Sequence, residues 1–277
     1  MQKIYEPFQY LKAGIRIWPL MVRDIIDHRE LISRLFWRNL ISRYKQSLFG
    51  QVWIVLMPLL MVGTFAFLKK TGVFQFGATS VPYPLFALTG LIIWQVFSTG
   101  LITGCSSLVS AGDMISKINF PRESLVFASL AQAVLEFIIK LVLLAIFLVI
   151  FNYPVTLLGI ILFLITVIPI FILTLGLSLF FSLVTGIFRD TVNILSVLVT
   201  LGMFLSPVVY PLKISNNNFW LQLNLLTPLI DAPRDALLLG KVTNWSMWGV
   251  ASIFSILVFL VAWRVFYIAE TKIAERI

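Results

Sequence analysis

Residues 71–112 read TGVFQFGATSVPYPLFALTGLIIWQVFSTGLITGCSSLVSAG, a run of 42 residues without one Asp, Glu, Lys or Arg. The hydrocarbon core of a bilayer is roughly 30 Å thick, and about 20 apolar helical residues cross it. Four more uncharged runs lie elsewhere in the chain, at 46–68, 141–188, 191–212 and 242–263. The sequence therefore predicts an all-α polytopic membrane protein.

The composition agrees with a membrane protein and limits the other possibilities. Hydrophobic residues make up 60% of the 277 residues and charged residues 12%, against about 25% charged in a typical soluble domain. We expect one helix bundle with modest extramembrane pieces and no added catalytic domain. In a soluble protein the net charge of +9 would suggest nucleic acid. Here the basic residues lie beside apolar spans, so we expect no nucleic acid but contact with anionic membrane lipid.

The sequence shows no pattern for catalysis or metal binding. Cys105 is the only cysteine and His28 the only histidine, whereas disulfides and the usual zinc sites need several such residues. The phosphate-binding pattern G-x-x-x-x-G-K-[ST] and the nucleophile pattern G-x-S-x-G are both absent. The first 45 residues are too rich in charge for a cleavable signal peptide. We therefore expect no enzymatic activity, no metal and no cofactor on this chain.

Six transmembrane helices are predicted, at about 48–68, 84–109, 124–151, 156–185, 193–210 and 245–267. Residues 219–240 are apolar as well, but two prolines and three charged residues interrupt them: Pro228, Asp231, Pro233, Arg234 and Asp235. A lipid-exposed helix tolerates neither such charges nor missing backbone donors. We therefore expect short re-entrant or interfacial helices between the fifth and sixth spans.

Residues 1–47 are predicted to form a cytoplasmic segment ahead of the transmembrane domain, 48–277. Within it, Arg29–Tyr44 has apolar residues at helical spacing and arginines mostly on other faces, which is typical of an amphipathic helix in the membrane interface. The alternative is an ordinary surface helix on a soluble core. Fifteen Lys or Arg lie on the side of the two termini and five on the opposite side. The positive-inside rule therefore places both termini in the cytoplasm.

Two pairs of charged residues are candidates for a site. Glu136 and Lys140 lie one helical turn apart inside the third span. They form either a self-neutralised pair at a protein interface or part of the lining of a path. Asp231 and Asp235 share a helical face, as catalytic carboxylates would, but capping and salt bridging at a helix start explain them as well.

Several ordered motifs resemble those of ABC-transporter permeases that export polysaccharides. They are Arg43–Ser47 with Gly50 and Trp53 before Pro58–Leu59, Phe120–Glu123, Phe188–Asp190, Ser206–Pro211 and Thr227–Ile230. The resemblance runs from about residue 30 to the end of the chain. It implies a homodimer of six-span subunits, each seated on a separate ATPase subunit that holds ATP and magnesium. A continuous channel between the two protomers would pass a polyprenyl-diphosphate-linked glycan across the cytoplasmic (inner) membrane.

Three sets of residues are candidates for this function. Coupling to the two ATPase subunits is expected at Phe120, Pro121, Arg122, Glu123, Arg189 and Asp190. Cations that could receive the lipid diphosphate cluster before the first span, at Arg38, Arg43 and Lys45. Aromatic rings that could stack on sugars along the channel are Phe65, Phe67, Trp94, Phe97, Phe204 and Tyr210. The alternatives are, in turn, a plain connector, positive-inside anchoring, and aromatic residues that face lipid or packing neighbours.

We therefore expect a permease subunit for a lipid-linked polysaccharide of the O-antigen, capsule or teichoic-acid type. Two rivals stay open. One is a membrane glycosyltransferase acting on a polyprenyl-linked sugar, with Asp231 and Asp235 as its acids. The other is an ABC exporter of a small lipid or drug with the same fold.

Overall fold

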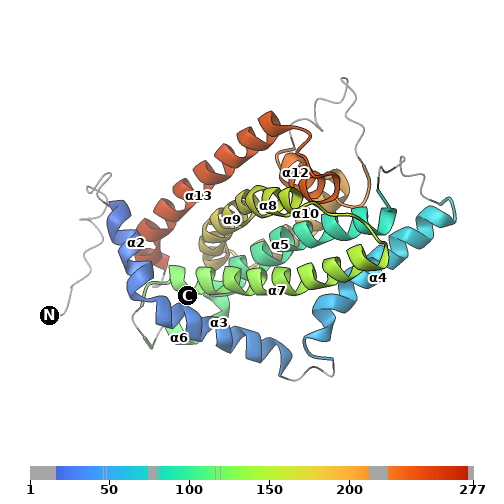
Figure 1. The fold of residues 1–277 in the computed structure, drawn as a ribbon. Helices are drawn as coiled ribbons and strands as arrows, with labels where there is room; N and C mark the ends of the chain where they lie inside the picture. The colour runs from blue at the N-terminus through green and yellow to red at the C-terminus, as the bar shows by residue number, and fades with distance from the viewer. Residues whose placement is uncertain are drawn as a thin grey trace.

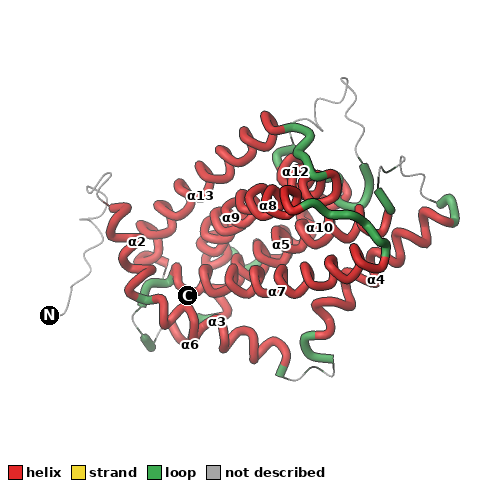
Figure 2. The backbone as a smooth tube through the Cα atoms, in the orientation of Figure 1, coloured by secondary structure: helices red, strands yellow, loops and turns green. Residues whose placement is uncertain are grey.

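The computed structural model describes residues 17–45, 47, 49–73, 79, 81–115, 117–118, 120–211 and 224–273, and these residues contain no strand. Figures 1 and 2 show them as one bundle of helices. In chain order the helices are α2 (Ile17–Asp27), α3 (Arg29–Tyr44), α4 (Val52–Lys70), α5 (Tyr83–Ser110), α6 (Gly112–Ile115), α7 (Glu123–Ile150), α8 (Leu157–Thr166), α9 (Ile168–Ile187), α10 (Thr191–Leu205), α12 (Leu226–Leu239) and α13 (Trp245–Ile273). Residues 1–16 of the predicted cytoplasmic segment, Leu48 at the predicted start of the first span and residues 274–277 lie outside the described residues.

Five stretches of the described residues are long and apolar enough to cross a membrane: Val52–Lys70, Tyr83–Ser110, Glu123–Ile150, Leu157–Ile187 and Trp245–Glu270. The prediction of an all-α polytopic membrane protein is therefore confirmed.

The helix at the fifth predicted span is shorter than expected. It has 15 residues and ends at Leu205 rather than near residue 210. Pro207 disfavours helical backbone at the residue before it, and Ser206 is accordingly extended, with φ −114° and ψ 153°. Fifteen helical residues rise only about 22 Å, so the count of six crossings stays a prediction.

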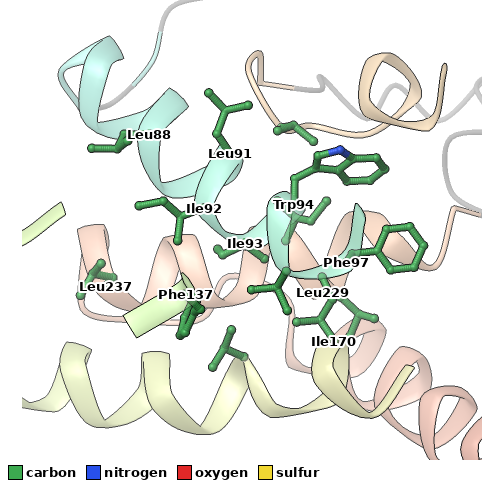
Figure 3. Packing of buried hydrophobic residues seen from close by; sticks show 14 of the residues in the cluster. Leu88, Leu91, Ile92, Ile93, Trp94, Phe97, Phe137, Ile170, Leu229 and Leu237 are labelled. Carbon is green, nitrogen blue, oxygen red and sulfur yellow. The ribbon is translucent and has the colours of Figure 1, made fainter. Parts of the chain in front are cut away.

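The helix α5 lies at the centre of the bundle and packs against α4, α7, α9, α10 and α12 (Figure 1). It carries no charged residue, and a helix that is apolar on all sides is buried by its neighbours. Figure 3 shows its side chains packed with those of α7, α9 and α12 in the largest buried cluster, which includes Leu91, Ile92, Phe137, Ile170 and Leu229.

Small residues allow α5 and α9 to approach closely. Gly100 and Gly104 form a G-x-x-x-G pattern on the side of α5 that meets Thr174 and Ser178. The Ser178 hydroxyl donates a hydrogen bond to the Gly100 carbonyl at 3.2 Å. A Cβ atom added at Gly104 would lie 2.5 Å from the Ser178 side chain. Close backbone approach with an interhelical hydrogen bond stabilises helix pairs in lipid, so this contact sets the relative position of α5 and α9.

The fourth predicted span, 156–185, is divided into α8 and α9 at Val167. Pro169 follows the division and has no backbone N–H, so one helical hydrogen bond is missing there. The Thr166 carbonyl, at the end of α8, accepts a hydrogen bond from the Trp248 indole of α13 at 3.1 Å.

Among the described residues of the range 219–240, where the sequence predicts short re-entrant or interfacial helices, lies the helix α12. It packs against α5, α8, α9 and α13, and most of its apolar side chains are buried by protein. Arg234 and Asp231 form an ion pair within it, so the charges are satisfied inside the bundle. The helix ends at Gly240, whose φ of +69° is a conformation that favours glycine. The depth of α12 in the membrane stays a prediction.

The helix α3 occupies the range in which the sequence predicts an amphipathic helix. It lies along α7 (Figure 1) and buries Leu35 and Leu40. Trp37 and Ile41 are 56% and 59% exposed. Apolar side chains therefore occur both on the side covered by the bundle and on the uncovered side, which suits a helix that also meets lipid.

Candidate functional site

A cavity of about 570 Å³ lies among α4, α5, α7 and α10, beside the end of α3. Much of its wall is apolar or aromatic, with Trp53, Met57 and Met61 from α4, Trp94 from α5 and Met203 from α10. Its polar wall consists of a few hydroxyl and amide groups and three charged side chains. A concave surface with mostly apolar walls and a few convergent polar groups is the usual form of a binding site.

The three charged residues of this cavity form one cluster. The Oε1 atom of Glu136 accepts a hydrogen bond from Nη1 of Arg43 at 2.8 Å, and its Oε2 atom lies 3.6 Å from Nζ of Lys140. The side chains of Glu136 and Lys140 are each 6% exposed, and that of Arg43 is 42% exposed. The two residues pair within α7, share this contact with Arg43 and line a cavity, and whether that cavity is part of a path stays a prediction.

Arg43 is the one predicted diphosphate-binding cation that lines this cavity. Arg38 lines a second cavity, of about 320 Å³, together with Gln132. Its guanidinium also donates to the Asn39 side chain at 3.1 Å. Gln132, in the wall of the second cavity, contacts Glu136, in the wall of the first, with 3.5 Å between Nε2 and Oε1. Lys45 is exposed just beyond α3 and lines neither cavity.

The segment Phe120–Glu123, predicted to couple to an ATPase, is bound to the C-terminal part of α13. The Arg122 backbone N–H donates to Oε2 of Glu270 at 3.3 Å, and the Arg122 guanidinium donates to the Glu270 carbonyl. Burial lowers the pKa of Arg122 from its ordinary value, an effect that the charge of Glu270 opposes. Glu123 is fully buried and accepts a hydrogen bond from the Trp263 indole at 2.6 Å. Glu123 therefore contacts α13 rather than a soluble partner, and the coupling function of the segment stays a prediction.

Arg189 and Asp190, the other predicted coupling residues, lie on an exposed turn between α9 and α10. Phe188 precedes them and is 67% exposed. Phe120, the aromatic residue of the other predicted coupling segment, is half-buried and packs against a buried cluster. An exposed aromatic residue beside charged residues is therefore found at Phe188, and such an aromatic anchor suits a groove on a partner.

Comparison with known proteins identifies the family. The family model described as ABC-2 type transporter matches residues 30–238. The chain belongs to this family. It is 28% identical over 251 residues to the O-antigen export system permease protein RfbA of Myxococcus xanthus, a match that covers 84% of this chain and 95% of that protein. Two proteins of the same name from Klebsiella pneumoniae are 26% and 25% identical over 241 residues, covering 86% of this chain and 91% of each relative.

Trp94 is the one predicted channel aromatic that lines the cavity of this ABC-2 transporter. Phe97 lies beside it, with 5.4 Å between the ring centroids, but is buried in the core (Figure 3). Phe97 therefore does not line this cavity.

The other predicted aromatics lie outside the cavity lining. Phe67 and Phe204 are 65% and 49% exposed. Phe65 is half-buried against the core, and the Tyr210 hydroxyl donates a hydrogen bond to the Phe204 carbonyl. Whether these four residues line a channel between two protomers stays a prediction.

The reasoning from the sequence missed most of the α4 wall. Trp53, Met57 and Met61 lie four residues apart in turn, which places them on one face of a helix. That spacing is a signal for a helix face that could line a cavity. In the sequence analysis, Trp53 belongs only to the motif that precedes Pro58–Leu59. Nothing in the sequence links this face to Met203 on α10, because only the packing brings α4 and α10 to the same cavity.

The two acids that the glycosyltransferase alternative requires, Asp231 and Asp235, form contacts outside the cavity. Asp231 accepts from the Arg234 guanidinium, and Asp235 accepts from the Thr243 hydroxyl. Neither acid lines the cavity. The salt bridge of Asp231 agrees with one part of the alternative, but neither acid caps a helix start, because α12 begins at Leu226 and has no acidic residue in its first turn.

Glu123→Ala is expected to loosen the junction between α7 and α13. The substitution leaves the buried Trp263 N–H without its acceptor, which costs about 1–3 kcal/mol, whereas Glu123→Gln keeps an acceptor and should cost less than about 1 kcal/mol. Thermal unfolding in detergent, followed by tryptophan fluorescence, measures the difference. Equal unfolding temperatures for the two variants would contradict this account of the hydrogen bond.

Proposed function

We propose that this ABC-2 transporter chain is the permease subunit of an ABC exporter that moves a lipid-linked polysaccharide outward across the cytoplasmic (inner) membrane. A separate ATPase subunit would bind and hydrolyse ATP with magnesium. Three relatives, each matching more than four fifths of this chain, carry the name O-antigen export system permease protein. Those names support a polysaccharide as cargo.

The observation that carries the proposal is the composition of the central cavity. Trp53 is 37% exposed and presents its indole ring, and flat aromatic faces can stack on the C–H surfaces of sugar rings without requiring one pattern of hydroxyl groups. Trp94 lies in the same wall but is 3% exposed. Arg43 and Lys140 bring cations to the same wall, and cations suit the phosphate groups of a lipid carrier. A sugar polymer on a diphosphate lipid combines these two chemistries.

We also propose that two copies pair across α4 and α10. Only 17% of the α4 span is buried within the chain. On α10, Ile194, Leu198 and Leu201 are 54–59% exposed. Since α4 and α10 both border the cavity, a second copy on this face would enclose it as a channel between protomers.

Two routes could carry the motion of the ATPase subunits to this cavity. Phe188, Arg189 and Asp190 are exposed for contact at the end of α9. The helix α3 carries Arg43 into the cavity wall, where it pairs with Glu136. A displacement of α3 or of the 188–190 turn would therefore change the cavity directly.

Co-expression with the cognate ABC ATPase, followed by purification in mild detergent, tests the proposal. We expect a complex with the mass of two copies of each subunit, and ATPase activity that depends on assembly. Phe188→Ala/Arg189→Glu should weaken assembly by about 30-fold or more, as loss of an interface anchor does. Phe120→Ala/Arg122→Ala should affect assembly less, since the Arg122 contacts are internal.

The matched control is Lys70→Ala, which replaces an exposed lysine at the last residue of α4. This variant should assemble as the parent does. A parent chain that purifies as a monomer and never retains the ATPase would contradict the proposal and favour the glycosyltransferase. A stable complex that transports a small lipid or drug in vesicles, but no glycan, would favour the other rival.

A further inference from the structure

The charge cluster of the cavity lies about halfway along α7. This helix has 28 residues, from Glu123 to Ile150, and Glu136 and Lys140 lie near its middle. A helix of that length measures about 42 Å, about 12 Å more than the hydrocarbon core of a bilayer, so the middle of α7 lies inside the core wherever α7 crosses it. Ionisable groups inside the core are costly and mark sites of function. The C-terminal part of α3 brings Arg43 to Glu136.

The cluster has more positive than negative charge. One carboxylate, Glu136, faces two cations, and its contact with Lys140 is the looser one, at 3.6 Å against 2.8 Å for Arg43. The Lys140 ammonium has three donors and lines the open cavity. Gln132 gives Glu136 a further neighbour at 3.5 Å. An anion entering the cavity would therefore meet two cations. The Glu136 carboxylate, if the anion replaced it at these cations, would still have the Gln132 amide as a hydrogen-bond donor.

We propose that Arg43, Glu136 and Lys140 form a phosphate-binding site at the middle of α7 for the anionic group of the transported lipid, and that Glu136 occupies the two cations when no phosphate is present. This inference rests on the proposed function, because it takes the cargo to carry a phosphate. A phosphate replaces Glu136 at the cations through charge-assisted hydrogen bonds. When it leaves, Glu136 returns, so the buried Lys140 ammonium is not left without its carboxylate. The exchange lowers the cost of moving the phosphate across without trapping it.

Binding of farnesyl diphosphate to the purified full-length chain in detergent tests the site. We expect Lys140→Gln to weaken this binding by roughly tenfold or more, as loss of a charge-assisted contact does. Glu136→Gln should tighten it several-fold, because the competing carboxylate is removed while an amide of the same size remains. The matched control Lys70→Gln removes an exposed lysine at the end of α4 and should leave the affinity unchanged.

Two further probes define the ligand. Farnesol, which lacks the phosphates, should bind equally weakly to the parent and to all variants. Inorganic diphosphate should bind much more weakly than farnesyl diphosphate. Equal affinity for the two diphosphates would assign the site to a free anion and overturn its assignment to a lipid.

Other results would overturn the inference itself. Unchanged farnesyl diphosphate binding in Lys140→Gln would do so. A loss of binding in Glu136→Gln as large as that in Lys140→Gln would show that Glu136 builds the site rather than occupying it. If Lys140→Gln folds poorly, Glu136→Gln/Lys140→Gln removes both charges from α7 and should bind roughly tenfold or more weakly than Glu136→Gln alone. Binding equal to that of Glu136→Gln would overturn the proposal.

Export of polysaccharide to the cell surface separates this inference from the proposed function. Parent-level export by Lys140→Gln, in cells where the parent exports, overturns the phosphate site and leaves the proposed function standing. A parent that exports no polysaccharide contradicts the proposed function, while the farnesyl diphosphate measurements still decide the site.

Discussion

Arg234→Ala is expected to lower the free energy of unfolding by about 3 kcal/mol, the lower end of the cost of removing one partner of a buried ion pair, because the Asp231 side chain left behind is 32% exposed. The Arg234 side chain is 5% exposed and joins three parts of the chain. It pairs with Asp231 on its own helix and donates to the Pro207 carbonyl after α10 at 2.5 Å. Its guanidinium also lies 3.8 Å from the centre of the Phe86 ring on α5. The alanine variant loses all three contacts and leaves the Asp231 carboxylate without its cation.

Thermal unfolding of the purified chain in detergent measures this loss. Asp231→Ala/Arg234→Met removes both charges and should recover part of the stability, because buried pairs are often replaced by apolar residues at little cost. Lys241→Ala changes an exposed lysine just beyond the same helix and should have almost no effect. An Arg234→Ala variant that unfolds at the temperature of the Lys241→Ala variant would contradict the assignment of Arg234 as the central contact of α12.

Gly90→Ala is expected to destabilise the protein by about 3 kcal/mol, at the upper end of the usual cost of overpacking. Alanine in place of glycine ordinarily stabilises a helix interior by about 1 kcal/mol. Here the added Cβ atom would overlap the backbone carbonyl oxygen of Val208 and lie 3.3 Å from Nη1 of Arg234. A backbone oxygen cannot rotate away as a side chain can, so the turn after α10 would have to move off α5.

The opposite sign is expected at two other helical glycines. A Cβ atom added at Gly63 of α4 or Gly249 of α13 meets nothing within 4 Å. Gly63→Ala and Gly249→Ala should therefore raise the unfolding temperature slightly or leave it unchanged. Unfolding temperatures of the three variants, measured side by side, check the contrast. Equal behaviour of Gly90→Ala and Gly63→Ala would show that Val208 does not pack on Gly90 as described.

Gly90 and Arg234 together hold the turn after α10 against α5. This turn fixes the end of α10, and α10 places Met203 in the wall of the cavity. Loss of either contact should therefore disturb the cavity as well as the fold. A lower affinity for farnesyl diphosphate in Gly90→Ala would agree with this connection.

The class of the protein and the positions of most helices can be predicted from the sequence. Charge is costly in hydrocarbon and backbone groups there must bond internally, so uncharged runs of 22–48 residues predict membrane helices wherever they occur. The range Arg29–Tyr44 could be predicted from local spacing, and α3 occupies it. The ordered motifs were sufficient to indicate the family. All of these are properties of single segments, which the neighbouring helices alter little.

Which residues each helix contacts follows only from how the helices pack together. Arg43 and Glu136 are 93 residues apart in the chain and form an ion pair. Glu123 and Trp263 are 140 residues apart and share a hydrogen bond that holds Glu123, the last residue of the predicted coupling segment Phe120–Glu123, against α13. Hydropathy cannot reveal such pairs, because it does not depend on how a helix is rotated about its axis. That rotation is set by close contacts such as Gly100 and Gly104 against Ser178, and it determines which side chains reach the central cavity.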